Sequence, residues 1–118
     1  MRILKRKKKR IFIPSKFSKS SIKDCAKIIL KPNEQVTFLT SDGKEYDFTR
    51  TYWGYYATPS INFRLKKNKF LSFIIKSKIN SKFFVMVVEK QKINLFKKYL
   101  KQERLKIIPW PKKEIFIY

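Results

Sequence analysis

Residues 50–65 read Arg50-Thr51-Tyr52-Trp53-Gly54-Tyr55-Tyr56-Ala57-Thr58-Pro59-Ser60-Ile61-Asn62-Phe63-Arg64-Leu65, and they decide the fold we expect. Four rings surround Gly54, where a glycine permits a backbone turn that other residues resist. The pair Thr58-Pro59 predicts the start of a short helix, because threonine caps helices and proline suits their first position. This helix would run to about residue 67, with Ile61 and Leu65 facing inward.

The segment before this stretch predicts a β-hairpin. Residues 35–40 and 44–49 alternate in polarity around Ser41-Asp42-Gly43, and Asp-Gly supplies the positive φ values of a tight turn. Glu45 and Asp47 share one face, and we interpret them as water-facing residues rather than as an acid–base pair. The opposite, core-facing side would carry Val36, Phe38, Tyr46 and Phe48.

The N-terminal segment, residues 1–20, is basic and contains several serines, and we expect a flexible arm there. Like charges repel one another along its run Lys5-Arg6-Lys7-Lys8-Lys9-Arg10. After this arm, Ser21 would cap a short turn or helix that reaches Ala26.

The second half of the chain predicts strands at 70–76 and 82–89, a helix at 91–104 and a strand at 105–108. The helix is amphipathic, because its apolar residues recur at helical spacing. The run Phe83–Val88 has no polar alternation, which predicts a central strand covered on both faces. The succession of strand, helix and strand predicts a right-handed parallel crossover.

These elements add up to one α+β domain at 21–118, preceded by the arm at 1–20. We expect a small mixed sheet of about five strands, a short helix after the first hairpin and one crossover helix. Residues 112–118 would be a mobile tail or an edge strand.

The net charge is +22, from 30 Lys and Arg against 8 Asp and Glu, which indicates a polyanionic partner and above all nucleic acid. An anionic membrane surface is a further partner that the arm would suit. The alternative is a composition inherited from an AT-rich genome, because Lys, Ile, Phe, Asn and Tyr are all abundant. That bias does not by itself account for the scarcity of Asp and Glu.

Several functional classes lack their sequence signals. The chain has one cysteine, Cys25, and no histidine, so it lacks an internal disulfide and the commonest proton shuttle and metal ligand. It has no Gly-rich phosphate loop and no Ser-His-Asp arrangement. We therefore expect no enzymatic activity, no cofactor and no metal. Its apolar runs are too short for a membrane span or a signal peptide, so we expect a soluble, cytoplasmic protein.

Aromatic and basic residues form the strongest candidate site, because single-stranded nucleic acid is bound by rings that stack on bases and cations that follow phosphates. Arg64 is the first choice for a phosphate or carboxylate, since its planar guanidinium can donate two hydrogen bonds. Backbone amides at the helix start near Ser60 would add donors. The alternative is that the rings belong to the core. The predicted nucleic-acid- or anion-binding residues are Lys5, Arg6, Lys7, Lys8, Lys9, Arg10, Arg50, Tyr52, Trp53, Tyr55, Tyr56, Ser60, Arg64, Lys66 and Lys67.

The block from Trp53 to Asn62, followed by Arg64 and Leu65, resembles a group of small uncharacterised bacterial proteins. That group also has a preceding hairpin pattern, matched here by Glu34–Phe38 and Gly43–Asp47. The resemblance covers about residues 28–110, although Phe63 replaces the glycine that the group tends to have. It implies an accessory role near the synthesis of cell-surface polysaccharide, and it supplies no catalytic residues.

Three functions are therefore open at the level of sequence. The first is a non-enzymatic protein that binds RNA or other single strands through the arm and the aromatic block. The second is an accessory or ligand-binding protein of surface-polysaccharide synthesis, and the third is a basic structural subunit of a ribonucleoprotein. The sequence does not fix the oligomeric state.

Overall fold

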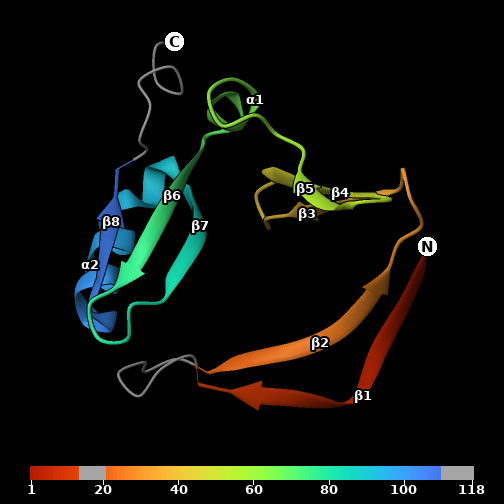
Figure 1. The fold of residues 1–118 in the computed structure, drawn as a ribbon, viewed down its shortest axis with the longest axis horizontal. Coiled ribbons are helices and arrows are strands. Elements are labelled where there is room, and N and C mark those ends of the chain that lie inside the picture. Colours follow the sequence, from red (N-terminus) through yellow and green to blue (C-terminus); the bar gives the residue numbers. More distant parts are fainter. Residues whose placement is uncertain (14–20, 110–118) are drawn as a thin grey trace. The chain divides into compact units, whose positions relative to one another are not determined.

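A computed structural model describes residues 1–13 and 21–109 (Figure 1). The chain divides into two compact units, Met1–Leu39 with Glu45–Thr58 and Thr40–Lys44 with Pro59–Tyr118. The described elements are β1 (Arg2–Phe12), β2 (Ile22–Ile29), β3 (Gln35–Leu39), β4 (Glu45–Thr51), β5 (Gly54–Ala57), α1 (Arg64–Lys67), β6 (Phe70–Ser77), β7 (Phe83–Glu89), the 3₁₀ turn η1 (Lys90–Lys92), α2 (Ile93–Glu103) and β8 (Leu105–Ile108).

The predicted fold class, an α+β domain built on one mixed sheet of about five strands, is wrong. The described residues form a mainly β structure with three separate sheets, whose strand orders are β1-β2, β3-β4-β5 and β7-β6-β8. All the strand pairs of the described residues are antiparallel. The prediction failed because three strands went unrecognised, namely β1, β2 and β5.

The N-terminal residues form a two-stranded ribbon, β1 with β2, where the sequence predicted a flexible arm and then a turn or helix from Ser21 to Ala26. The pairing is regular at both ends and shifts between Lys5 and Arg10. Residues 6–9 of β1 stand opposite Cys25 alone, which makes a large bulge in the middle of the basic run. The predicted domain boundary near residue 20 falls outside the described residues and stays a prediction.

The predicted hairpin is present as β3 and β4, with Gly43 at a φ of 90° in its turn. The four residues expected on its core face do share a face, and the Phe48 ring meets the rings of Phe38 and Tyr46 edge-on. The burial differs from the expectation on both faces, because Asp47, expected to face water, is buried at 3% exposure, and Phe38, expected in the core, is half exposed. Asp47 is buried because β4 is the central strand of its sheet, with β5 on its second edge.

The helix predicted from Pro59 to about residue 67 is shorter and starts later, since α1 spans four residues from Arg64. Thr58 is not its N-cap. The Thr58 hydroxyl lies 2.7 Å from the Thr49 hydroxyl, and the Thr58 amide donates to the Asp47 carbonyl at 3.0 Å. These bonds continue the pairing of β5 with β4 by one residue, so Thr58 is held beside β4 and not at the start of the helix. Leu65 faces inward as predicted and is almost completely buried.

The second unit contains the predicted strand–helix–strand succession as β7, α2 and β8. Both strands pair antiparallel to β6, so β7 and β8 run in the same direction on either side of it (Figure 1). The central strand is therefore β6, and the prediction that Phe83–Val88 is central is wrong. An unbroken apolar run does not show that a strand is central. Strand β7 lies at the edge of its sheet, and Phe83 and Val85 on it are exposed.

The core of the second unit lies between this sheet and α2. Phe96 and Leu100 of α2 pack with Ile75 and Val88, and the rings of Phe73 and Phe96 stack with centroids 5.4 Å apart. The helix ends where Arg104 adopts a left-handed φ of 54°. The amphipathic pattern therefore predicted both the existence of α2 and its buried face.

Two further expectations concern the C-terminal residues and the possibility of a membrane-spanning helix. The predicted tail or edge strand at 112–118 lies outside the described residues. In residues 1–13 and 21–109, no helix has the length and apolar character required to cross a bilayer.

Candidate nucleic-acid interface

The β4–β5 hairpin carries the aromatic block at its tip. Thr51 pairs with Gly54, so Tyr52 and Trp53 occupy a two-residue turn. Neither turn residue has a positive φ, whereas Gly54 adopts a φ of 152° directly after them. Gly54 therefore supplies the unusual backbone conformation that closes this turn. We call Tyr52, Trp53, Tyr55 and Tyr56 the aromatic tip.

All four rings of the aromatic tip are exposed. Their exposed fractions are 86% for Tyr52, 65% for Trp53, 59% for Tyr55 and 44% for Tyr56. The alternative that these rings form part of the core does not hold, because each presents a large fraction of its surface to solvent. Exposed rings so close together on one hairpin are available for stacking on a ligand.

The strand register places the rings on two faces of the hairpin. Tyr55 is the cross-strand partner of Arg50, and the Arg50 guanidinium lies over its ring at 5.0 Å from the centroid. Tyr56 lies on the opposite face, where its ring stacks with Trp53 at a centroid distance of 6.0 Å and an angle of 22°. The aromatic tip thus offers a cationic face and a stacked aromatic face.

Arg50 also holds the backbone of the turn. Its Nη1 donates to the carbonyl of Thr51 and, at 3.1 Å, to the carbonyl of Gly54. The Thr51 hydroxyl donates to the same Gly54 carbonyl at 3.0 Å. Part of the guanidinium fork is therefore used inside the hairpin, and the charge over Tyr55 is held in a defined place.

The predicted basic run lies on β1 and centres on Asp24. Arg6 and Arg10 each place a guanidinium nitrogen 2.9 Å from the same Asp24 oxygen. The hydrogen bond from Arg6 is the main cause that lowers the pKa of Asp24 below its usual value. Lys5, Lys7, Lys8 and Arg10 are exposed, Arg6 is half-buried, and Lys9 belongs to the same strand.

The charge of the first unit far exceeds what its acids can neutralise. That unit contains thirteen Lys and Arg against four Asp and Glu. One of the four is Asp24, which already has two arginine partners. Most of the positive charge therefore has no acid within its own unit, which suits a polyanionic ligand.

The remaining predicted residues belong to the second unit, separate from the aromatic tip and Arg50. Arg64 and Lys67 are exposed on α1, and Lys66 is half-buried there. The helix does not start near Ser60 as expected, because α1 begins at Arg64 and the Ser60 hydroxyl accepts the Arg64 amide at 3.2 Å. That hydroxyl is used inside the turn. Anion binding by Ser60 stays a prediction.

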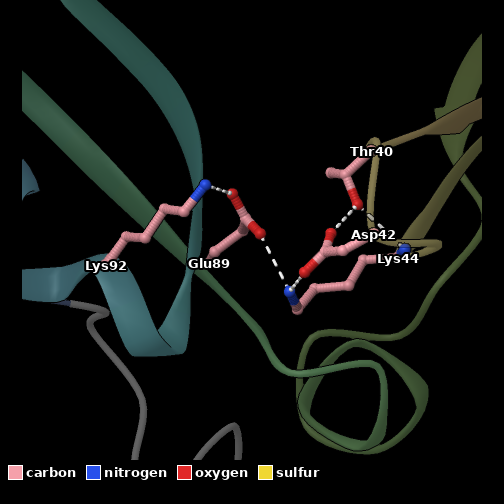
Figure 2. A network of polar contacts seen from close by, with 5 residues as sticks. All are labelled: Thr40, Asp42, Lys44, Glu89 and Lys92. Carbon is pink, nitrogen blue, oxygen red and sulfur yellow. Dashed lines mark hydrogen bonds and ion pairs between the residues drawn. The ribbon is translucent and has the colours of Figure 1, made fainter.

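The second unit also holds a chain of alternating charges (Figure 2). Lys44 is bonded to Asp42 and, at 3.0 Å, to Glu89, while Lys92 reaches Glu89 at 2.9 Å. The Thr40 hydroxyl donates to Asp42 as well. The hydrogen bond from Lys44 is the main cause that lowers the pKa of Asp42 to about 2. Lys44 and Lys92 are thus engaged with acids of this protein.

The described residues contain no group of three or more His, Cys, Asp or Glu placed to hold a metal ion. Cys25 is exposed and free, and its thiol lies 3.6 Å from the Lys23 carbonyl. Sequence reasoning missed one surface altogether, the apolar residues of the β1–β2 ribbon, which are exposed at both of its ends. The apolar residues that flank the basic run, Ile3-Leu4 before it and Ile11-Phe12-Ile13 after it, were the signal for it.

Comparisons with protein-family models, with curated proteins and with solved structures found no match for this chain. The resemblance to a group of small bacterial proteins therefore stays a prediction.

Proposed function

We propose that this protein binds nucleic acid, RNA or other single strands, without catalysing a reaction. The observation that carries the proposal is the exposure of all four rings of the aromatic tip on a chain whose net charge is +22. Unpaired bases present flat faces that such rings can cover, and their phosphates require cations nearby. The lone cysteine allows no internal disulfide, which agrees with a cytoplasmic binding protein.

The aromatic tip would supply the contact to bases. Stacking on an exposed ring is worth about 1–3 kcal/mol per base and tolerates any base. Trp53 and Tyr56 already lie nearly parallel, so a base can add to their stack without a rearrangement of the hairpin. On the other face, Arg50 holds positive charge beside Tyr55, where a phosphate would follow a stacked base.

The basic strand β1 would supply attraction at longer range. Cations that replace condensed counterions make affinity fall steeply with salt, with a slope of about −0.7 for each phosphate contacted on a single strand. Lys5, Lys7 and Lys8 are exposed and can take part. The proposal therefore requires strong binding at low salt and a marked loss at physiological salt.

The second candidate is an accessory or sugar-binding protein of surface-polysaccharide synthesis. The exposed Trp53–Tyr56 stack favours it as well, because the apolar face of a sugar ring packs on aromatic rings. A structural role in a ribonucleoprotein is the third candidate, and it shares the nucleic-acid contacts of the first. The salt dependence of binding and competition between the two ligands distinguish the sugar-binding candidate from the nucleic-acid-binding one.

The test uses the fluorescence of Trp53 in a Trp110→Phe background, so that a single indole reports on the aromatic tip. We expect a uridine oligonucleotide to quench this emission at about 50 mM salt and a duplex of equal length to quench it less. An acidic polysaccharide that quenches more strongly than the oligonucleotide would favour the second candidate. No quenching by any single strand at this salt would contradict the proposal.

Matched variants assign the effect to the aromatic tip. Tyr55→Ala should weaken oligonucleotide binding about tenfold, which corresponds to about 1.4 kcal/mol. Phe83→Ala is the control, because this ring in the second unit has the same 59% exposure. An equal loss in both variants would mean that the site is elsewhere.

A further inference from the structure

The β1–β2 ribbon has an unusual combination of surfaces. It is a sheet of two strands, with no third strand among residues 1–13 and 21–109. A two-stranded ribbon is marginally stable alone in water, because it buries little apolar surface. We therefore expect a partner to cover one face of the ribbon, and the side chains on that face indicate the chemistry of the partner.

The pairing of the strands sorts the side chains into two faces. Residues 22, 24, 26 and 28 of β2 share one face, and each of their β1 partners points the same way. This face carries two apolar cross-strand pairs, Ile3 with Ile28 and Phe12 with Ile22. All four side chains are exposed, and we call them the apolar face.

The other face is mixed. Each of its three pairs joins one basic and one apolar residue: Arg2 with Ile29, Leu4 with Lys27 and Ile11 with Lys23. The two faces therefore differ in character, since apolar residues meet one another directly on the apolar face alone.

Positive charge surrounds the apolar face. The two strands contain nine Lys and Arg and a single acid, Asp24. Lys5 and Arg10 lie on the apolar face itself, between its two apolar pairs, and the guanidinium of Arg10 lies 5.7 Å from the centre of the Phe12 ring. Asp24 is held by Arg6 and Arg10, so the surface presented outward is cationic.

We propose that the ribbon lies on an anionic lipid bilayer, with its apolar face toward the acyl chains and its cations at the lipid phosphates. Nucleic acid would neutralise the cations and leave the exposed Ile and Phe side chains in water. A bilayer interface accepts both kinds of group at the same depth. A second copy of the chain would bring nine cations against nine others, which disfavours it as the occupant.

This role goes beyond the proposed binding of single strands. Both roles draw on the cations of β1. The membrane contact requires the apolar face, whereas single strands require the aromatic tip, so either one can hold without the other. Because the inner leaflet of a cell is negative, the ribbon would hold the protein at the membrane while the aromatic tip engages its own ligand.

The first test is flotation of the full chain with vesicles of phosphatidylcholine, alone and with about one third phosphatidylglycerol. We expect binding to the anionic vesicles and little to the neutral ones. The double variant Ile3→Ser, Ile28→Ser keeps every charge and should bind at least about tenfold more weakly. The control is Leu39→Ser, since Leu39 is an exposed aliphatic residue of the same unit outside the ribbon.

A second test, by tryptophan fluorescence, uses a variant that keeps an apolar side chain at its position in the ribbon. In a background with Trp53→Phe and Trp110→Phe, Phe12→Trp places the single indole on the apolar face. Its emission should shift to the blue on anionic vesicles, and lipids brominated on their acyl chains should quench it. Leu39→Trp in the same background should be quenched several-fold less.

Three results would overturn the proposal. One is equal loss of vesicle binding in the Ile3→Ser, Ile28→Ser variant and in Leu39→Ser. Another is equal quenching of the two introduced indoles by brominated lipid. The third is a blue shift of the Phe12→Trp emission that grows with protein concentration in the absence of lipid, because a second copy would then cover the apolar face.

Discussion

The guanidinium carbon of Arg50 lies 5.0 Å from the centroid of the Tyr55 ring, its partner across the β4–β5 hairpin. The same guanidinium donates to the Thr51 and Gly54 carbonyls, so one side chain fixes both the turn and one ring of the aromatic tip. A Lys at this position keeps the charge but cannot donate in the same fixed fork.

Arg50→Lys should therefore lower the free energy of unfolding by about 1 kcal/mol, the usual net value of a lost hydrogen bond. Urea denaturation followed by circular dichroism measures it. Arg10→Lys is the control, because Arg10 is largely exposed and its charge is retained. An equal change in both variants would mean that the bonds to the turn do not stabilise the hairpin.

Gly54→Ala should destabilise the same turn for a different reason. A Cβ at Gly54 would meet no atom within 4 Å, so the cost comes from the backbone φ of 152° alone. We expect a loss of about 1 kcal/mol and faster amide exchange in β5. Ser41→Ala, in a turn position without positive φ, should leave exchange in β5 unchanged. Full stability in Gly54→Ala would contradict the conformational explanation.

Asp24→Asn should loosen the ribbon, because Arg6 and Arg10 lose their shared carboxylate. Amide exchange in β2 should become faster, and attraction to any polyanion should increase. Glu45→Gln removes the same unit of charge from another strand and should leave exchange in β2 unchanged. If the amides of β2 exchanged at the same rate in both variants, the Asp24 carboxylate would not stabilise the ribbon.

Asp42 should make stability depend on pH at the acidic end. Its pKa is lowered from 3.8 to about 2, so the folded state favours the carboxylate more strongly than the unfolded state does. This contribution is present above the unfolded pKa and is lost as the pH falls through about 2. The Tm of the wild type should therefore exceed that of Asp42→Asn at pH 5. The difference should shrink between pH 3.8 and about 2 and vanish only below about 2. A difference that is constant over this range would exclude a role for the charge of Asp42.

Ile75→Ala should be the most damaging of these substitutions. Ile75 is fully buried beneath α2, and removing its side chain leaves a cavity that costs about 2–5 kcal/mol. Ile79→Ala is the control, since Ile79 is exposed in the turn after β6 and should change stability by less than about 0.5 kcal/mol. Comparable losses in both variants would mean that the sheet and α2 do not form a packed core.

Local patterns in the sequence predicted the local structure well. Asp42-Gly43 predicted the β3–β4 turn, and the spacing of Phe96 and Leu100 predicted the buried face of α2. Both signals depend on neighbours within a few residues, where sterics and periodicity act directly.

Pairing between distant segments could not be predicted in the same way. The run from Lys5 to Arg10 has the composition of a solvated arm, yet it belongs to a strand that pairs with β2, where Asp24 accepts a hydrogen bond from Arg10, fourteen residues before it. Strand β5 has four residues, which is too short for a periodic signal, so the burial of Asp47 beside it was missed.

The candidate site could be predicted in part. The residue types of the aromatic tip and their clustering were evident, but whether the rings face solvent depends on the register of β4 and β5. The grouping with Arg64, Lys66 and Lys67 assumed one domain, whereas the structure assigns these residues to another unit.

The position of β6 has a consequence for the order in which the second unit assembles. Its edge with β7 closes through a short turn, since Lys76 pairs with Phe83, whereas its edge with β8 joins Ile74 to Ile108. Contacts that are near in the chain form first, because less loop entropy is lost. During synthesis, the second edge of β6 therefore stays open until β8 has been made, and an open strand edge of this kind can meanwhile recruit another nascent chain.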